Sequence, residues 1–295
     1  MLKFKAAVLG GLLAVMMPVG LNGTLADEFT PFEDASRLVS IGGSLTEIVY
    51  ALGAEDKLVA RDSTAVYPAA VFDLPDVGYM RALAPEGVMS VNPTALLVIE
   101  GSGPPEVLEV LAQSGVPYVT VPEEHSHAGI LNKVRAVGAV LDLPEKAAQV
   151  VAEVDAALTE AEALTGSISE RKRVLFVLST TGDSLLVSGT DTAADGVIGM
   201  SGAVNAVTEF SGYKTLSPEA IIAAKPDVIL MMDRGDHNVV DEFLWSDAAI
   251  AMTPAGENKS IIRMDGAYLL GFGPRTAAAV RELVGLLYPD AGKAE

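Results

Sequence analysis

The segment "DVGYMRALAPEG", Asp76 to Gly87, brings together two side chains that could bind a metal. Tyr79 follows Gly78 and precedes Arg81 by two residues, so in an extended loop the tyrosine and the arginine point to the same side. A nearby guanidinium favours the phenolate over the phenol. Phenolate is a hard anionic ligand for ferric iron. The pair therefore suggests an iron ligand beside a cation; the alternative is a half-buried tyrosine that only packs its ring.

Two other segments hold residues that could do chemistry. "EEHSHAG" groups Glu123, Glu124, His125 and His127, a set able to bind zinc. The run lies where a strand passes into a helix, so a solvated polar loop is the expected structure, and a metal-dependent enzyme that uses Glu123, His125 and His127 stays a secondary alternative. "IGGSLTE" is similar to the Gly-Asp-Ser-Leu motif of esterases, but Gly43 replaces the aspartate and no Asp-x-x-His follows downstream. We therefore expect Ser44 to cap a helix, with Glu47 completing a capping box.

The elements that would position these residues alternate between strand and helix. Short apolar runs such as "RLVSIGG", "KLVARD" and "TALLVIEG" are separated by helical stretches, which is typical of parallel sheets covered by helices. The pattern recurs after "RVLFVLST". "LAPEGVMSVNPTALLVIE" from Leu83 and "LSPEAIIAAKPDVILMMD" from Leu216 share a Leu-x-Pro-Glu helix start and a later proline in the same register. We therefore expect two α/β lobes of similar design.

A long run of helix-forming residues separates the lobes. "LPEKAAQVVAEVDAALTEAEALTGS" has no glycine or proline between Pro144 and Gly166, which predicts one helix of about 20 residues. The expected division is a signal peptide at 1–26, an N-terminal lobe at 27–142, a linking helix at 143–167 and a C-terminal lobe at 168–295. A linker of this kind is a stiff strut rather than a loop hinge.

The N-terminus and the charge indicate the compartment. Lys3 and Lys5 precede an apolar run too short for a comfortable membrane span, and small residues follow up to Ala26, as in a cleavable signal peptide. Removing these two lysines changes the net charge from −19 to −21, which disfavours nucleic acid and anionic membranes as partners. No cysteine is present for disulfides or for a lipid anchor. We expect a periplasmic protein with no stable membrane insertion.

The chain resembles the periplasmic haem-binding proteins of bacterial haem ABC importers, in the helix-linked class that also carries siderophores and vitamin B12. The likeness rests on "RLVSIGGSLTEIVYALG", "ARDSTAVYP", "DVGYMRALAPEG", "SGTDTAADGVIGMSGAVNAV" and "GPRTAAAV". It implies two Rossmann-like lobes with parallel sheets, joined by one helix, with the ligand in the cleft between them. It also implies that Tyr79 ligates haem iron, with Arg81 next to it. The histidine that holds a second haem in some members has no counterpart in "SLLVSGTDTAADG".

Haem also needs cations for its two propionates and apolar contacts for its faces. The cations expected from loops at strand ends are Arg61, Arg81, Arg234 and Arg275. The expected apolar contacts are Met80, Met232 and Phe272. In the resembling family, glutamates at the positions of Glu86 and Glu219 form salt bridges to the permease.

We therefore expect a monomeric carrier that captures haem in the periplasm, delivers it to a membrane permease and catalyses nothing. A siderophore or cobalamin carrier of the same fold is the main alternative, and it would need no iron ligand from the protein.

Overall fold

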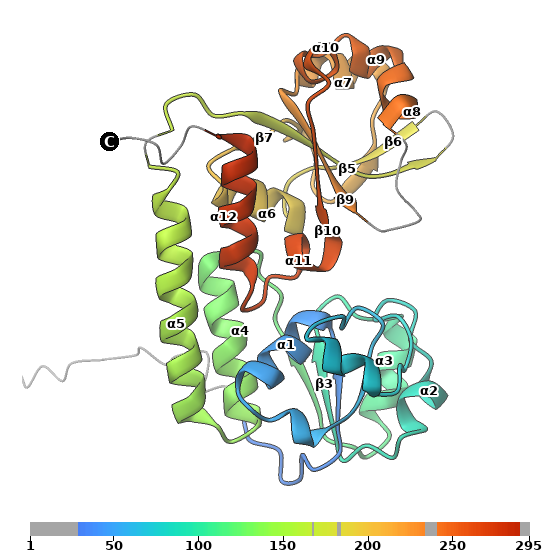
Figure 1. The fold of residues 1–295 in the computed structure, drawn as a ribbon. Coiled ribbons are helices and arrows are strands. Elements are labelled where there is room, and N and C mark those ends of the chain that lie inside the picture. Colours follow the sequence, from blue (N-terminus) through green and yellow to red (C-terminus); the bar gives the residue numbers. More distant parts are fainter. Residues whose placement is uncertain (1–28, 167, 182–183, 234–240, 290–295) are drawn as a thin grey trace, which may run out of the picture.

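The computed structural model describes residues 29–166, 168–181, 184–233 and 241–289, so the expected signal peptide lies outside the described residues. Two α/β lobes lie one above the other in Figure 1, and helix α5 (Pro144–Ala163) runs along one side of both. Its 20 residues span about 30 Å at 1.5 Å per residue. Among the described residues, no helix combines the length and the hydropathy needed to cross a bilayer.

The N-terminal lobe is built on a fully parallel sheet with the strand order β2-β1-β3-β4. Strands β1 and β3 are buried along their whole length, which is why they read as continuous apolar runs. The strands are β1 (Leu38–Ile41), β2 (Leu58–Arg61), β3 (Ala95–Ile99) and β4 (Tyr118–Val121). The helices are α1 (Gly43–Ala51), α2 (Pro85–Met89), α3 (Pro105–Ala112) and α4 (His127–Val140), with 3₁₀ turns η2 (Glu55–Lys57) and η3 (Ala69–Asp73).

The C-terminal lobe has a mixed sheet, which differs from the parallel sheet expected there. Strand β5 pairs in parallel with β7 and β9, and β10 pairs in parallel with β9, but β6 runs antiparallel to both β5 and β8. Only two residues separate β5 from β6 in the sequence, far fewer than a parallel crossover requires. The strands are β5 (Arg173–Thr181), β6 (Ser184–Ser188), β7 (Val204–Asn205), β8 (Tyr213–Thr215), β9 (Val228–Asp233) and β10 (Ile261–Asp265).

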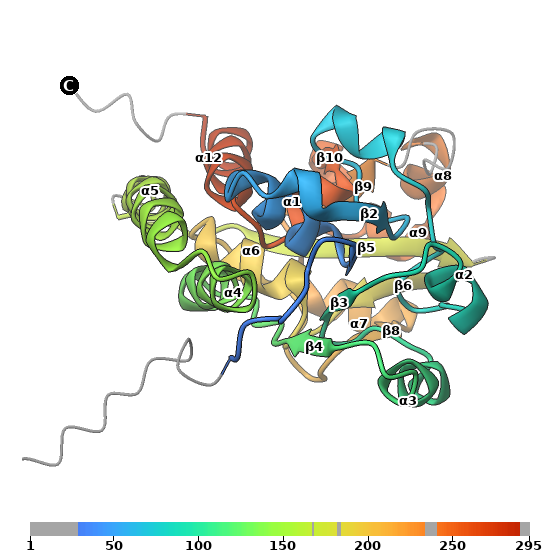
Figure 2. The ribbon, with the colours of Figure 1, turned by 90° about the horizontal axis from the view of Figure 1, so that it is seen from below.

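The helices of this lobe divide between the two faces of the sheet. They are α6 (Ala193–Met200), α7 (Pro218–Ala224), α8 (Asp241–Ser246), α9 (Ala248–Ala251), α10 (Pro254–Asn258), α11 (Gly266–Leu270) and α12 (Thr276–Leu287). Figures 1 and 2 both place α5 beside α4 and α12 at one side of the molecule. Gly138 of α4 permits part of this packing, because a Cβ there would lie 2.3 Å from the Cβ of Ala147 in α5.

The internal repeat has the same backbone ending in both lobes. Asn92 after α2 and Lys225 after α7 each adopt a left-handed conformation, with φ of 50° and 46°, immediately before a proline. The two positions differ by 133 residues, the same offset that separates Leu83 from Leu216. Each turn ends a helix and leads into a buried strand, as the repeat predicted.

Within the residues that the structure describes, three apolar clusters form the core. One packs α2 and α3 against the N-terminal sheet, and one packs α7, α9 and α10 against the C-terminal sheet. The third is shared by the lobes: it includes Ile48 of α1, Val137 of α4, Leu158 of α5 and Leu283 of α12. The two lobes are therefore joined by a continuous apolar core as well as by the chain.

Candidate functional site

Tyr79 lies on a loop that leaves the carboxyl end of the N-terminal sheet. Gly78 has φ of 106°, a conformation that disfavours other residues, and it turns the chain so that Tyr79 is 44% exposed. The Arg81 Nη1 donates a hydrogen bond to the Tyr79 hydroxyl at 3.1 Å. The two side chains therefore meet on the same side of the loop, with the oxygen of the tyrosine directed to an exposed cation.

The groups around Arg81 come from both lobes. Burial raises the pKa of Glu123, which precedes α4, and that of Tyr213 in β8, and it lowers the pKa of His125. The charge of Lys133 lowers the pKa of His125 further, and the positive charge of Arg81 has a smaller effect on all three groups. The tyrosine loop of the N-terminal lobe thus faces the C-terminal lobe.

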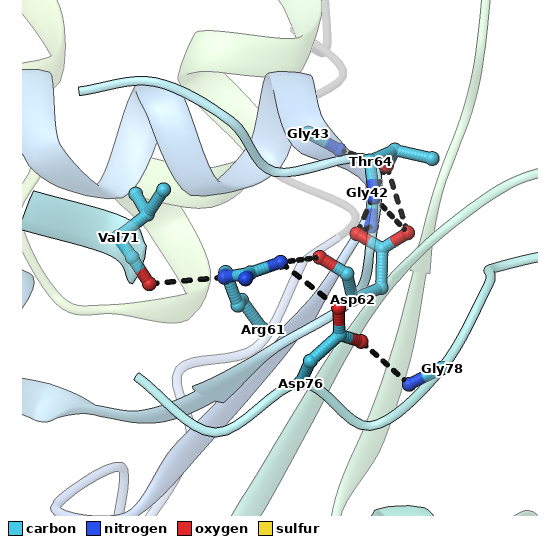
Figure 3. A network of polar contacts seen from close by, with 8 residues as sticks. All are labelled: Gly42, Gly43, Arg61, Asp62, Thr64, Val71, Asp76 and Gly78. Atoms are coloured by element: carbon cyan, nitrogen blue, oxygen red, sulfur yellow. Dashed lines mark hydrogen bonds and ion pairs between the residues drawn. The ribbon is translucent and has the colours of Figure 1, made fainter. Parts of the chain in front are cut away.

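Arg61, which we expected to bind a propionate, is instead buried beneath this loop. It is 8% exposed, and its guanidinium donates to the carbonyls of Val71 and Asp62 and to the Asp76 carboxylate (Figure 3). Its charge also lies 5.1 Å from the centre of the Phe72 ring. Arg61 therefore has a structural role, because its donors are used in holding the segment that leads to Gly78.

A second correction concerns the start of α1. Gly42, not Ser44, is the N-cap, and the helix has no side-chain cap of its own. The Gly42 N–H donates to the Asp62 carboxylate at 2.9 Å and the Gly43 N–H to Thr64 Oγ1 at 2.9 Å (Figure 3). Residues after β2 thus satisfy the helix N-terminus, so Ser44 is left for another partner.

That partner is Lys133 of α4, a lysine 1% exposed that no motif had indicated. Its Nζ donates to both oxygens of Glu123 at 2.7 and 2.8 Å, to Ser44 Oγ at 3.3 Å and to the Phe272 carbonyl at 3.0 Å. Phe272 belongs to the other lobe and is fully buried. Its ring meets His125 edge-on, 5.0 Å between centroids, so it packs in the lobe junction rather than lining an open pocket as expected.

Arg275, another expected propionate contact, also joins the lobes. Its guanidinium makes a two-point ion pair with Glu47 of α1, with Nε to Oε2 at 3.0 Å. It lies 4.0 Å from the Tyr67 ring centre and 5.3 Å from that of Tyr268. Glu47 is therefore an inter-lobe ion-pair partner and not the second half of a capping box.

The remaining expected contacts are less informative. Met80 and Met232 are half-buried and pack against the core, and Arg234 lies outside the described residues. Glu86 and Glu219 are exposed in the first turns of α2 and α7, one in each lobe. Hydrogen bonds from its own N–H and from Ser217 lower the pKa of the Glu219 carboxyl.

The histidine segment does not form a metal site. His127 lies between two acids of α5, with Nε2 2.8 Å from Asp155 and Nδ1 3.2 Å from Glu162. In the part of the chain that the structure describes, no three His, Asp or Glu side chains are placed to hold a metal ion. A groove of about 450 Å³ opens beside His125, His127 and α6, but Tyr79 and Arg81 are not among its lining residues.

Comparison with known proteins agrees with this architecture. A model of the periplasmic binding protein family matches residues 38–268. The periplasmic heme-binding protein RhuT from Roseiflexus sp. RS-1, in apo form, is 37% identical, with 88% of this chain and 100% of that chain covered and a TM-score of 0.82. The periplasmic heme-binding protein BhuT in complex with two hemes is 36% identical, with 85% of this chain and 97% of that chain covered and a TM-score of 0.81. The vitamin B12-binding protein of Vibrio parahaemolyticus is 24% identical over 252 residues, or 85% of this chain and 89% of that protein.

Proposed function

The chain belongs to the periplasmic binding protein family, and on this basis we propose that it captures haem in the periplasm and delivers it to an ABC-type permease. The observation that carries the proposal is the hydrogen-bonded pair of Tyr79 and Arg81 on a loop that faces the other lobe. An exposed phenol beside a guanidinium can supply an anionic oxygen to ferric iron. The proteins RhuT and BhuT, at 37% and 36% identity, support haem as the cargo.

In this proposal Tyr79 is the axial ligand of the haem iron, and Arg81, which donates a hydrogen bond to the Tyr79 hydroxyl, holds that oxygen in place and offers a cation to a propionate. Half-buried Met80 offers an apolar contact to the porphyrin. The protein carries haem and catalyses no reaction. It reaches the periplasm through a signal peptide at 1–26 and acts as a monomer.

Haem titration followed by optical spectroscopy tests the assignment. Wild-type protein should give a high-spin ferric tyrosinate spectrum. Tyr79→Phe keeps the ring but removes the donor oxygen, so it should fold normally, lose that spectrum and bind haem at least about tenfold more weakly, which corresponds to about 1.4 kcal/mol. Tyr67→Phe is the matched control, because Tyr67 is similarly exposed, at 46%, and should keep the wild-type spectrum.

Cobalamin is the alternative cargo that one relative supports, the vitamin B12-binding protein at 24% identity. A cobalamin or a ferric siderophore brings a filled coordination sphere and needs no ligand from Tyr79. Titration with cyanocobalamin should therefore separate the two functions. Tight binding of cobalamin, unaffected by Tyr79→Phe and without a haem spectrum, would overturn the proposal.

Docking on the permease is assigned to Glu86 and Glu219. Each is an exposed acid in the first turn of the equivalent helix of its lobe, so the pair suits two cationic pockets on a two-fold symmetric partner. The simpler role of both residues is a favourable interaction with the helix dipole.

A further inference from the structure

We propose that Asp62 is a positioning residue for Tyr79, and that its buried carboxylate ties the tyrosine loop to the N-terminus of α1. The inference deepens the proposed function and rests on it where Tyr79 is taken as the iron ligand. The carboxylate itself is fully buried and touches no exposed ligand surface, so it acts through the backbone.

Two separate segments donate to this carboxylate. Gly42, in the turn between β1 and α1, donates its N–H to Oδ1 at 2.9 Å. Thr64, just after β2, donates its N–H to Oδ2 at 3.0 Å and has its hydroxyl within 2.9 Å of both oxygens. Ser63, between Asp62 and Thr64, donates its N–H to the carbonyl of Gly78, the residue before Tyr79, at 2.9 Å. Figure 3 shows Gly42 and Thr64 converging on the Asp62 side chain.

Packing alone does not explain an aspartate at this position. A fully buried carboxylate loses its hydration, so it is retained only where enough donors replace the water. Both donor residues lie just beyond the end of a parallel strand, Gly42 after β1 and Thr64 after β2. An asparagine would keep one acceptor oxygen but would turn an NH₂ group toward an N–H donor. The geometry therefore requires an acceptor with two oxygens.

A second aspartate holds the other side of the tyrosine. Asp76 accepts the Gly78 N–H at 2.8 Å through Oδ1, and its Oδ2 lies 3.2 Å from Nη1 of Arg61. The residue before Tyr79 is thus fixed through the Asp76 side chain. Gly103 and Ser63 add backbone bonds to the carbonyls of Met80 and Gly78, at 2.8 and 2.9 Å. The loop is preorganised, and Asp62 connects it to the helix, because its carboxylate joins the Ser63–Thr64 turn that holds Gly78 to the N–H of Gly42.

A double-mutant cycle between Asp62→Asn and Tyr79→Phe tests the inference with the mature full chain and haem as the probe. Asp62→Asn should weaken haem binding at least tenfold and shift the tyrosinate bands. In the Tyr79→Phe background, where the loop no longer presents a ligand, the same change should have little further effect. An equal loss in both backgrounds would show general destabilisation and overturn the assignment, as would wild-type affinity and bands in Asp62→Asn.

Asp247→Asn is the matched control. Asp247 also accepts backbone N–H groups, from Ala249 and Ile250 at 2.8 and 2.9 Å, but it caps α9 in the other lobe. Its replacement should leave haem affinity and spectrum unchanged. If Asp62→Asn fails to fold, Thr64→Val removes the hydroxyl that bonds both the carboxylate and the Gly43 N–H, and it should give a smaller change in the same direction. Unchanged haem binding and spectrum in Thr64→Val would overturn the inference.

Amide hydrogen exchange separates this inference from the proposed function. Asp62→Asn should speed exchange at Gly42, whose N–H bonds the carboxylate, and at Ser63, whose N–H holds the Gly78 carbonyl, whereas Asp247→Asn should not, and neither measurement requires haem. Unchanged exchange at both amides would overturn the positioning role even if haem binds. If exchange changes as expected but the wild-type protein gives no haem spectrum, the positioning role of Asp62 stands and haem is rejected as the cargo.

Discussion

Lys133→Met should lower the free energy of unfolding by about 3–5 kcal/mol at neutral pH. The lysine side chain is fully buried, and its ammonium group lies within hydrogen-bond distance of four oxygens from three residues, which belong to both lobes. Methionine has a similar apolar length but none of these donors. It leaves the Glu123 carboxylate, 20% exposed, without its counter-charge, and the buried Phe272 carbonyl without its lysine donor.

Guanidinium chloride denaturation at 25 °C measures this loss. Lys133→Met combined with Glu123→Gln should lose less stability than the single lysine variant, because no uncompensated charge then remains. Lys172→Met, at an exposed position, is the control and should stay within about 0.5 kcal/mol of wild type. A loss below about 1 kcal/mol for Lys133→Met, or additive effects in the double variant, would refute the view that the ion pair is buried and coupled.

Three other predictions concern pH, motion and docking. The pKa of His125 is lowered in the folded protein, so the unfolded chain takes up the His125 proton first as the pH falls below 6.5. The free energy of unfolding should therefore drop by at most about 1.4 kcal/mol per pH unit. His125→Gln should reduce this drop between about pH 7.5 and 5.5, measured by thermal unfolding. With α5 and the junction in place, haem should change the radius of gyration in solution scattering only slightly, and a large decrease would contradict a stiff linker. The double variant Glu86→Lys, Glu219→Lys should bind haem normally but fail to support uptake into permease-containing vesicles; normal uptake would leave both glutamates as helix-end charges.

Local patterns were enough to predict the repeating elements. Helix formers without glycine or proline predicted α5, and the Asn-Pro and Lys-Pro pairs predicted where α2 and α7 end. The β6–β8 part of the second sheet was missed, because short runs such as "SLLVS" and "YKT" carry a weak signal that depends on the partner strand.

The site shows where sequence reasoning reaches its limit. The side-by-side placement of Tyr79 and Arg81 followed from their spacing of two residues. The roles of Ser44 and Arg275 did not, because their partners are 89 and 228 positions away in the chain. From its sequence position at the end of a strand, Arg61 was expected to be free to bind a propionate. Only the packing of η3 and the loop after it shows that the Arg61 side chain is buried.

The apolar cluster shared by α1, α4, α5 and α12 has a consequence for how the chain folds. Neither lobe can expose its inner face without also uncovering that of its neighbour, so the lobes should behave as a single cooperative unit. Many contacts in this cluster join residues far apart in the sequence, and such contacts tend to form late on the folding pathway. Their loss would then be the slow step of unfolding, giving the protein a long native lifetime even where its equilibrium stability is ordinary.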